Sequence, residues 1–197
     1  MKKDFIYLAS ASPRRGELLR QIGVPFKVRA AEIAEVRADG ERPEEYVRRL
    51  AAEKAEAVWA RVAVAAPRPV LAADTAVVLG GRVFGKPADA AEVEEMLAAL
   101  SGRTHRVLTA VALRCEESTE TVLSESEVRF RSTTAEERGA YSRSGEPLDK
   151  AGGYGIQGRA AMFVEHLAGS YSGVVGLPLF ETAALLTRCG VALWGVR

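Results

Sequence analysis

The sequence predicts an α/β protein in which a mixed, twisted sheet is flanked by helices and a cleft lies between two halves. Short apolar runs typical of strands alternate along the chain with segments of helical periodicity. The run of residues 70–73 is apolar throughout, which is typical of a strand buried on both faces. No clear linker divides the 197 residues, so we expect one domain over residues 1–197.

The charge balance argues against partners that need an extended basic surface. The chain has 27 basic and 26 acidic residues and a net charge of +1, so we expect no binding to duplex nucleic acid or to an anionic membrane. No apolar run has the length of a membrane span, and no signal peptide is evident. Cys115 and Cys189 lack the spacing of metal ligands. We therefore expect ordinary buried cysteines in a reducing compartment, and a cytoplasmic protein.

The N-terminal half is predicted to contain two helices and the central strand. Ser12 and Pro13 begin a helix that Gly23 ends, because serine caps a helix and proline suits its first position. A second helix is expected from Pro43 to about Val62. Strands are expected at residues 5–9, 25–28, 70–73, 75–79 and 82–84. Asp74 is expected to end the strand of residues 70–73, and a Gly80-Gly81 turn joins the last two strands.

The C-terminal half is predicted to alternate in the same way. Helices are expected at residues 89–100, at 135–143 and from Pro178 to before Gly190. Strands are expected at residues 106–114, 121–131, 162–165 and 191–194. Residues 144–158 and 170–176 are expected to form loops, because they are rich in glycine and serine.

The loop between the first strand and the first helix is a candidate anion site. Residues 10–15 read Ser-Ala-Ser-Pro-Arg-Arg. The free N–H groups and the dipole of a helix N-terminus favour negative charge, and the guanidinium groups of Arg14 and Arg15 suit phosphate oxygens. The alternative is a well-capped helix whose arginines are solvated. These residues alone do not decide between the two.

Two charged residues stand out against apolar patterns. Lys54 falls within the apolar stripe of its helix, four residues after Leu50. Its ammonium group either reaches solvent at the edge of the stripe or enters a polar cavity that holds an anion. Asp74 follows the apolar run of residues 70–73, and ligands of open α/β sheets gather at the carboxyl ends of strands. Asp74 is therefore a candidate site residue.

Several charged residues lie at the ends of predicted elements. The set comprises Arg14, Arg15, Glu35, Lys54, Asp74, Lys86, Asp149 and Lys150. Cations beside carboxylates suit a magnesium nucleotide, because the cations neutralise phosphate oxygens and the carboxylates hold a hard metal. The chain has neither a P-loop nor the glycine motif of a dinucleotide fold. His105, expected at a strand edge, and His166 lack the partners of a zinc site or catalytic triad.

Motifs that follow one another from residue 5 to about 187 resemble the Maf family. They are Ser-Ala-Ser-Pro-Arg-Arg (10–15), Glu-Lys-Ala (53–55), Ala-Asp-Thr (73–75), Gly-Lys-Pro (85–87), His-Arg-Val (105–107), Lys-Ala-Gly-Gly-Tyr-Gly-Ile-Gln-Gly (150–158) and Gly-Val-Val-Gly-Leu-Pro (173–178). The resemblance implies a Maf and inosine triphosphate pyrophosphatase-like fold. It also implies a nucleoside triphosphate pyrophosphatase that releases a monophosphate and pyrophosphate with a divalent metal, Mg²⁺ or Mn²⁺.

The resemblance further implies a role for each matching residue. Asp74 matches the family's proton acceptor, and Glu35 matches an acidic position near the metal and phosphates, so both are expected metal ligands. Phosphate oxygens would be bound by Ser12, Arg14, Arg15, Lys54 and Lys86. Arg15 has the alternative of pairing with a carboxylate.

The form of residues 150–158 resembles the branch of the family that acts on dTTP and UTP. Its specificity positions correspond to Arg14, Thr75 and Gln157. A glutamine amide is both donor and acceptor, so it suits the N3–H and a carbonyl of uracil or thymine. The alternative is a loop glutamine that bonds the backbone.

Two departures and two alternatives accompany this resemblance. Ala11 replaces a common glycine, and Ala34 stands where the family has an aspartate, so a second supporting carboxylate would have to come from Glu32. One alternative is a nucleotide-binding regulator without turnover, since Maf-like proteins are associated with inhibition of septum formation. The other is an inosine triphosphate pyrophosphatase, against which Gln157 argues. The resemblance also implies a homodimer.

Overall fold

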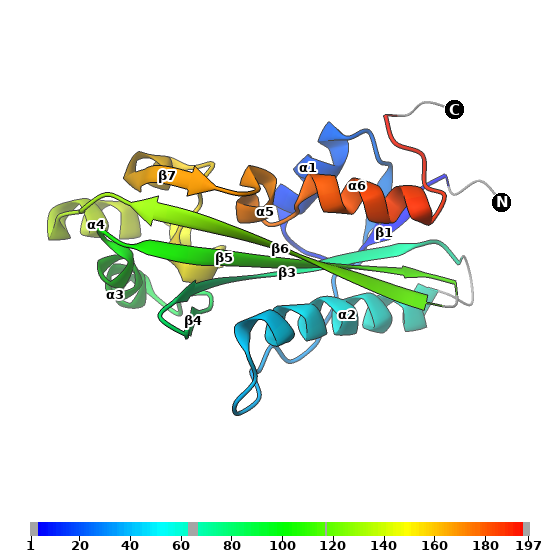
Figure 1. The fold of residues 1–197 in the computed structure, drawn as a ribbon, viewed down its shortest axis with the longest axis horizontal. Helices are drawn as coiled ribbons and strands as arrows, with labels where there is room; N and C mark the ends of the chain where they lie inside the picture. The colour runs from blue at the N-terminus through cyan, green and yellow to red at the C-terminus, as the bar shows by residue number, and fades with distance from the viewer. Residues whose placement is uncertain (1–3, 63–66, 117, 195–197) are drawn as a thin grey trace. The chain divides into compact units, whose positions relative to one another are not determined.

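The structure is a computed structural model that describes residues 4–62, 67–116 and 118–194 (Figure 1). The strands are β1 (Ile6–Leu8), β2 (Phe26–Val28), β3 (Val70–Leu79), β4 (Arg82–Phe84), β5 (Thr104–Cys115), β6 (Ser118–Phe130) and β7 (Val164–Ala168). The helices are α1 (Pro13–Gln21), α2 (Pro43–Val62), α3 (Ala90–Leu100), α4 (Ala135–Ser142), α5 (Tyr171–Val175) and α6 (Leu179–Arg188). Short 3-10 turns are η1 (Glu146–Asp149), η2 (Ala151–Gly153) and η3 (Arg159–Phe163).

The described residues form a seven-stranded mixed sheet with helices against it, which confirms the predicted fold class. The strand order is β2-β1-β3-β5-β6-β7, and β4 pairs with β3. β1 runs parallel to both β2 and β3. β4 and β7 pair antiparallel with β3 and β6.

The chain divides into two compact units. Unit 1 comprises Met1–Asp74, Thr109–Ser124 and Gly176–Arg197, and unit 2 comprises Thr75–Leu108 and Glu125–Val175. In unit 1, α2 covers one face of the strands while α1 and α6 lie on the other (Figure 1). In unit 2, α3 packs against α4. The expected cleft between two halves stays a prediction, as does the single domain.

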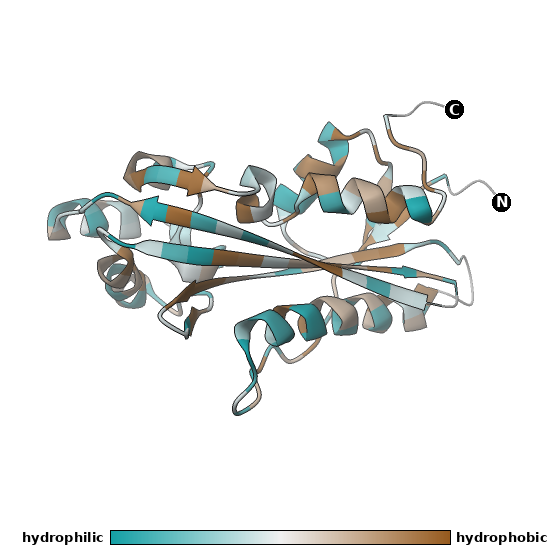
Figure 2. Cartoon of the chain, in the orientation of Figure 1, coloured by the Kyte–Doolittle hydropathy of each residue, from teal (hydrophilic) through white to brown (hydrophobic). Residues whose placement is uncertain are grey.

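α2 begins and ends where the sequence predicts. Its buried side follows helical spacing and includes Val47, Leu50 and Val58, with Lys54 among them. Figure 2 shows hydrophobic and hydrophilic residues alternating along this helix, as an amphipathic pattern requires. The buried stripe fixes which side of α2 faces the sheet, and this orientation carries Lys54 inward.

The central strand is longer than predicted, and Asp74 does not end it. β3 is continuous over ten residues, so Asp74 lies at its middle and is only 6% exposed. The expectation failed because a polar residue usually interrupts a buried strand. Here the carboxylate accepts a hydrogen bond from Lys54 Nζ at 2.7 Å, which compensates its burial.

Three other segments differ from the prediction. Residues 191–194 do not form a strand, and their only backbone bond to α1's C-terminal end is Trp194 N–H to Ile22 O at 3.0 Å. Residues 171–175 form α5, not a loop, because Ser170 Oγ accepts from Gly173 N–H at 3.0 Å and caps the turn. β7 begins at Val164, two residues later than predicted, because η3 occupies the positions before it.

His105 lies in the core of unit 2 and not at a strand edge. It is 1% exposed, because β5 lies between β3 and β6 in the sheet. Its ring makes edge contacts with Phe130 and Tyr154, and Nε2 lies 2.8 Å from Tyr154 Oη. Nδ1 has no hydrogen-bond partner among the described residues. Burial lowers the pKa of His105 to about 4, so the ring is neutral near pH 7.

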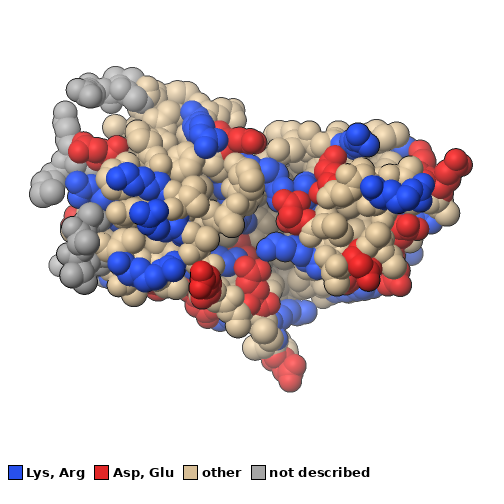
Figure 3. Space-filling view, turned by 180° about the vertical axis from the view of Figure 1, so that it is seen from behind, with Lys and Arg blue, Asp and Glu red and all other residues tan. Residues whose placement is uncertain are grey.

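The charged side chains are intermixed on the surface. On the face drawn in Figure 3, neither basic nor acidic residues cover the surface alone. None of the described helices combines the length and the apolar character needed to cross a membrane. The absence of nucleic-acid and membrane binding stays a prediction.

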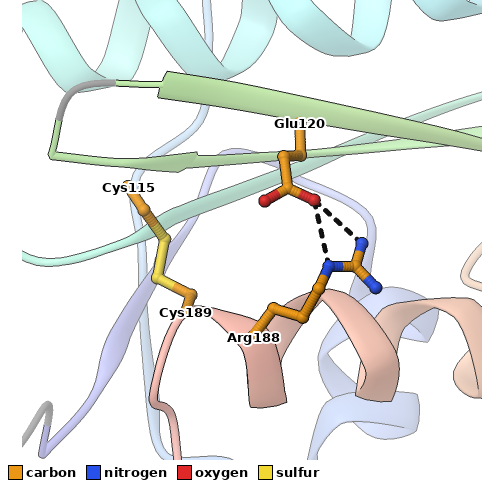
Figure 4. The surroundings of a disulfide bond; sticks show 4 residues. All are labelled: Cys115, Glu120, Arg188 and Cys189. Carbon is orange, nitrogen blue, oxygen red and sulfur yellow. Dashed lines mark hydrogen bonds and ion pairs between the residues drawn. A yellow bond between two sulfur atoms is a disulfide. The ribbon is translucent and has the colours of Figure 1, made fainter.

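The two cysteines are paired, which contradicts the expectation of ordinary buried residues. Cys115 at the end of β5 and Cys189 after α6 form a disulfide with a Cα–Cα distance of 6.5 Å (Figure 4). Both are only partly buried. Beside them, Arg188 donates to Glu120 Oε2 at 2.8 Å. Spacing along the sequence could not reveal a contact between positions 74 residues apart, and the cysteine argument for a reducing compartment no longer holds.

We predict that His105 makes stability rise with pH between about 4 and 6.5. In this window the unfolded histidine binds a proton that the folded one does not, so the contribution of His105 to the free energy of unfolding rises by about 3 kcal/mol across it and does not change with pH outside it. Urea titrations of the wild type and of His105→Phe at several pH values would measure this. His166→Gln, at an exposed position, is the control. Equal pH slopes in wild type and His105→Phe would contradict the prediction.

We also predict that the disulfide stabilises the folded protein. Closing a loop of 74 residues restricts the unfolded chain and contributes about 4 kcal/mol in the chain-entropy model. The Cys115→Ser/Cys189→Ser double variant should therefore unfold at lower urea concentration than the oxidised wild type. A reductant should lower the urea concentration at which the wild type unfolds and should leave that of the double variant unchanged. Two freely titrating thiols in the folded, unreduced protein would show that the bond is not formed.

Candidate active site

The first loop of unit 1 is built around Ser10. The buried Ser10 Oγ accepts from Ser12 N–H at 3.2 Å and from Arg15 Nη1 at 3.0 Å. Ser12 occupies the predicted N-cap position of α1, but its side chain makes no capping hydrogen bond. The serine hydroxyl therefore does not occupy the N–H groups at the start of α1. This arrangement suits the binding of an anion at the helix N-terminus.

Arg15 holds this loop to a second segment of unit 1. Its Nε donates to Gly176 O at 2.8 Å. Burial lowers the pKa of the guanidinium from its ordinary value, the charge of Asp74 raises it, Arg14 lowers it and Glu35 raises it. The loop and the two carboxylates are thus close enough for their charges to interact. The alternative of solvated arginines does not describe Arg15.

Lys54 is the centre of a buried ion cluster. Its Nζ lies 2.7 Å from Asp74 Oδ1 and 2.6 Å from Glu35 Oε1. Lys54 and Asp74 are 7% and 6% exposed, whereas the Glu35 side chain remains 41% exposed. Of the two alternatives for Lys54, an ammonium group that reaches solvent at the edge of the stripe is wrong, because Lys54 is buried and two carboxylates meet its charge. Three elements meet here: α2, β3 and the irregular segment before α2.

Tyr46 is a residue of this site that the sequence did not reveal. It lies on α2 two turns before Lys54, and its Oη donates to Glu35 O at 3.1 Å. Burial raises its pKa, and the charges of Asp74 and Glu35 act in the same direction. The feature that could have identified Tyr46 is its position on the partly buried side of α2. Tyr46 fixes the backbone that carries Glu35.

The carboxylates of Glu35 and Asp74 are of the ligand type that a hard divalent cation prefers. Magnesium commonly takes one or two protein carboxylates and completes its shell with water and substrate phosphates. In the structure, Lys54 Nζ lies between Glu35 Oε1 and Asp74 Oδ1 and binds both oxygens. The described residues contain no group of three or more acidic, histidine or cysteine ligands, so further oxygens would come from a ligand. Glu32 is exposed, and its role as an additional carboxylate stays a prediction.

Unit 2 gathers a second set of predicted residues. Thr75 is partly buried in β3, and Lys86 is exposed in the loop after β4. Gly152 N–H donates to Gly85 O at 2.9 Å, which joins η2 to that loop. Gly152 has a φ of +71°, and a Cβ there would lie 2.7 Å from Val77 Cγ2. Only glycine allows η2 to approach β3 so closely.

Gln157 lies on the surface of unit 2, within the glycine-rich segment. It is exposed, and its side chain makes no hydrogen bond to any of the described residues. The alternative of a glutamine that bonds the loop backbone is therefore wrong. Its amide is available to a ligand.

Comparisons with known proteins agree on one family. A family model described as Maf-like protein matches residues 5–189. A dTTP/UTP pyrophosphatase of Ralstonia nicotianae is 53% identical, over 95% of each chain. A dTTP/UTP pyrophosphatase of Cupriavidus pinatubonensis is 54% identical, over 94% of this chain and 96% of the relative.

A solved nucleoside-triphosphatase / dITP/XTP pyrophosphatase from Mycobacterium abscessus is far more distant. It is 17% identical, with a TM-score of 0.44 over 95% of each chain. By contrast, the family match extends over nearly the whole sequence and includes every residue of the ion cluster and of the first loop. The chain belongs to the Maf family.

Proposed function

We propose that this protein is a nucleoside triphosphate pyrophosphatase that hydrolyses dTTP and UTP to the monophosphate and pyrophosphate. The observation that carries the proposal is the buried cluster in which Lys54 bridges Asp74 and Glu35. Its charges interact with those of an arginine-bearing helix N-terminus, as a site for a polyanion requires. Relatives more than half identical carry the name dTTP/UTP pyrophosphatase, which supports the same substrates.

In the proposed reaction, the oxygen of a water molecule forms a bond to the α-phosphorus, and the bond from that phosphorus to the oxygen bridging to the β-phosphate breaks. Asp74 accepts the proton of the attacking water, and pyrophosphate leaves with the bonding electron pair. Lys54 Nζ holds Oδ1 of Asp74, which orients the carboxylate and leaves Oδ2 to accept the proton. The nucleophile is thus directed by a group whose own rotation is restricted.

Cationic groups would bind the phosphate chain, as the family resemblance implies. Arg14 and the first N–H groups of α1 suit non-bridging oxygens, with Ser12 beside them. Lys86 would bind further oxygens, including those of the leaving pyrophosphate. Arg15 donates to Ser10 and Gly176, so it supports the loop as well as adding positive charge.

A divalent ion, Mg²⁺ or Mn²⁺, would supply charge neutralisation and polarisation of phosphate oxygens when bound. Glu35 and Asp74 would hold it. Gln157 would read the pyrimidine edge through its amide, with Arg14 and Thr75 as the further specificity residues. The family resemblance also supports a homodimer. The cytoplasmic location stays a prediction, which the Cys115–Cys189 disulfide does not favour.

We predict that Asp74→Asn lowers kcat for dTTP and UTP by about 10²–10⁴-fold, the usual contribution of a general base. The amide is isosteric and can still accept from Lys54, so the fold should persist. Pyrophosphate release from a panel of nucleoside triphosphates, with Mg²⁺ or Mn²⁺, measures the effect. Asp39→Asn, at an exposed acid of unit 1, is the matched control.

Each other result of that assay has a clear meaning. Full activity in Asp74→Asn would remove Asp74 as the base. Nucleotide binding without turnover in the wild type would overturn the enzyme proposal in favour of a regulator. A preference for nucleotides with deaminated purines would show that the substrates are not dTTP and UTP, and would favour an inosine triphosphate pyrophosphatase.

We predict that Gln157→Leu raises KM for UTP and dTTP and reduces the preference for UTP over CTP by about tenfold, as expected when a hydrogen-bonding edge is lost. The value of kcat should change less, because the amide touches the base and not the phosphates. Steady-state kinetics with UTP and CTP would measure the separate effects on KM and kcat. Gln21→Leu, at the exposed end of α1, is the control. An unchanged UTP/CTP ratio would refute the assignment of Gln157.

A further inference from the structure

A carboxylate that the proposed reaction does not use lies inside the segment that carries Gln157. Glu146 begins η1 and is partly buried. Its Oε1 accepts from Tyr141 Oη–H at 3.0 Å, and its Oε2 accepts from Arg159 N–H at 3.1 Å. Both carboxylate oxygens are therefore engaged on one side by the buried Tyr141 and on the other by the backbone just after Gln157.

The backbone of residues 155–158 folds directly over this carboxylate. Gly158 N–H donates to Gly155 O at 3.0 Å, which closes a tight turn. Ile156 and Gln157 are the two central residues of that turn. A Cβ on Gly158 would overlap the carboxylate of Glu146 and lie 2.5 Å from its Cδ. Gly158 has a φ of −105°, so its lack of a side chain serves this close approach and not an unusual backbone angle.

The other end of the turn is held by the same group of side chains. Gly155 N–H donates to Tyr141 Oη at 3.2 Å. Lys150 Nζ donates to the main-chain oxygen of Glu146, and a Cβ on Gly155 would lie 2.7 Å from Lys150 Cε. Tyr141 thus donates to Glu146 and accepts from Gly155, so one chain of hydrogen bonds fixes both ends of the turn.

The side chain of Gln157 does not help to hold its own amide in place. Its side chain is exposed and bonds none of the described residues. The position of its amide therefore depends on the turn beneath it, and the turn depends on Glu146.

We propose that Glu146 is a positioning residue for base recognition: its carboxylate fixes the turn that presents Gln157, and Gly158 is required to admit it. This inference rests on the proposed function, in which Gln157 reads the base. A carboxylate suits the role because it accepts from two donors at once. An amide of the same shape offers one oxygen, so one of the two donors would face an NH₂ group instead.

The expected signature is a loss of selectivity with the chemical step retained. Glu146→Gln should raise KM for UTP and lower the UTP/CTP ratio of kcat/KM by about tenfold, the scale of one lost hydrogen bond to a charged group. The value of kcat should change by less than about twofold, because the Glu146 side chain bonds none of the residues that the proposed function assigns to the phosphates. Tyr141→Phe should act in the same direction. Glu136→Gln, at an exposed carboxylate of α4 in the same unit, is the control.

A double-mutant cycle tests the steric part. Gly158→Ala should reduce the UTP/CTP ratio in the wild type but have little further effect in Glu146→Ala, because the added methyl group then meets no carboxylate. Equal effects of Gly158→Ala in both backgrounds would overturn the contact as the reason for the glycine.

Amide hydrogen exchange gives a readout that is independent of turnover. The Arg159 and Gly155 amides donate to Glu146 and Tyr141, so both should exchange faster in Glu146→Gln than in wild type, with α3 unchanged. Unchanged exchange at both amides would overturn the inference even if activity fell, since the turn would then not depend on the carboxylate.

The Gln157→Leu variant separates failure of this inference from failure of the proposed function. If Gln157→Leu lowers the UTP/CTP ratio and Glu146→Gln does not, the positioning role is overturned and the proposed function stands. If Glu146→Gln changes exchange while Gln157→Leu leaves the ratio unchanged, Gln157 does not read the base, and both the base-reading proposal and this inference fall. Selectivity lost in both variants, with kcat retained, supports the inference.

Discussion

One ammonium group between two carboxylates constrains most of unit 1. Buried charges destabilise a fold by several kcal/mol unless they are paired, so Lys54 and Asp74 each require the other. This pairing fixes the face that α2 turns toward β3 and permits an aspartate in the middle of the central strand. Glu35 joins the same ammonium from a segment without regular structure. This ion pair links the segment to α2 and, through Lys54, to Asp74 of β3.

Unit 2 positions its candidate residues by a different means. Its core is aromatic, with Phe130, Tyr154 and Phe163 packed around β5 and β6. The segment of residues 146–159 is held against this core by hydrogen bonds and by glycines that allow close approach. The glycines of this segment are therefore as informative as its side chains, because each marks a place where another group approaches the backbone closely. In both units, hydrogen bonds to a carboxylate help to order an irregular segment.

The sequence predicted those features that depend on neighbouring residues. The helix from Pro43 to Val62 followed from its periodicity, and the Gly80-Gly81 hairpin followed from two glycines that adopt positive φ. Features that depend on distant contacts were not predicted. The sequence pattern predicts that Asp74 ends a strand, because its partner Lys54 lies 20 residues away and neighbouring residues do not reveal it. The sequence named Glu35, Lys54 and Asp74 as site residues, but the contacts among them, and Tyr46, required the fold. Their role in binding an anion stays a prediction.

The disulfide has a topological consequence for the covalent integrity of the chain. Cys115 and Cys189 both belong to unit 1, yet the segment between them includes all of residues 125–175, the larger part of unit 2. That segment is a covalent ring closed within unit 1. A single proteolytic cut anywhere inside the ring leaves one molecule, whereas a cut outside it releases a fragment. While the bond is oxidised, the segment that carries Glu146 and Gln157 cannot be separated from unit 1 by one nick.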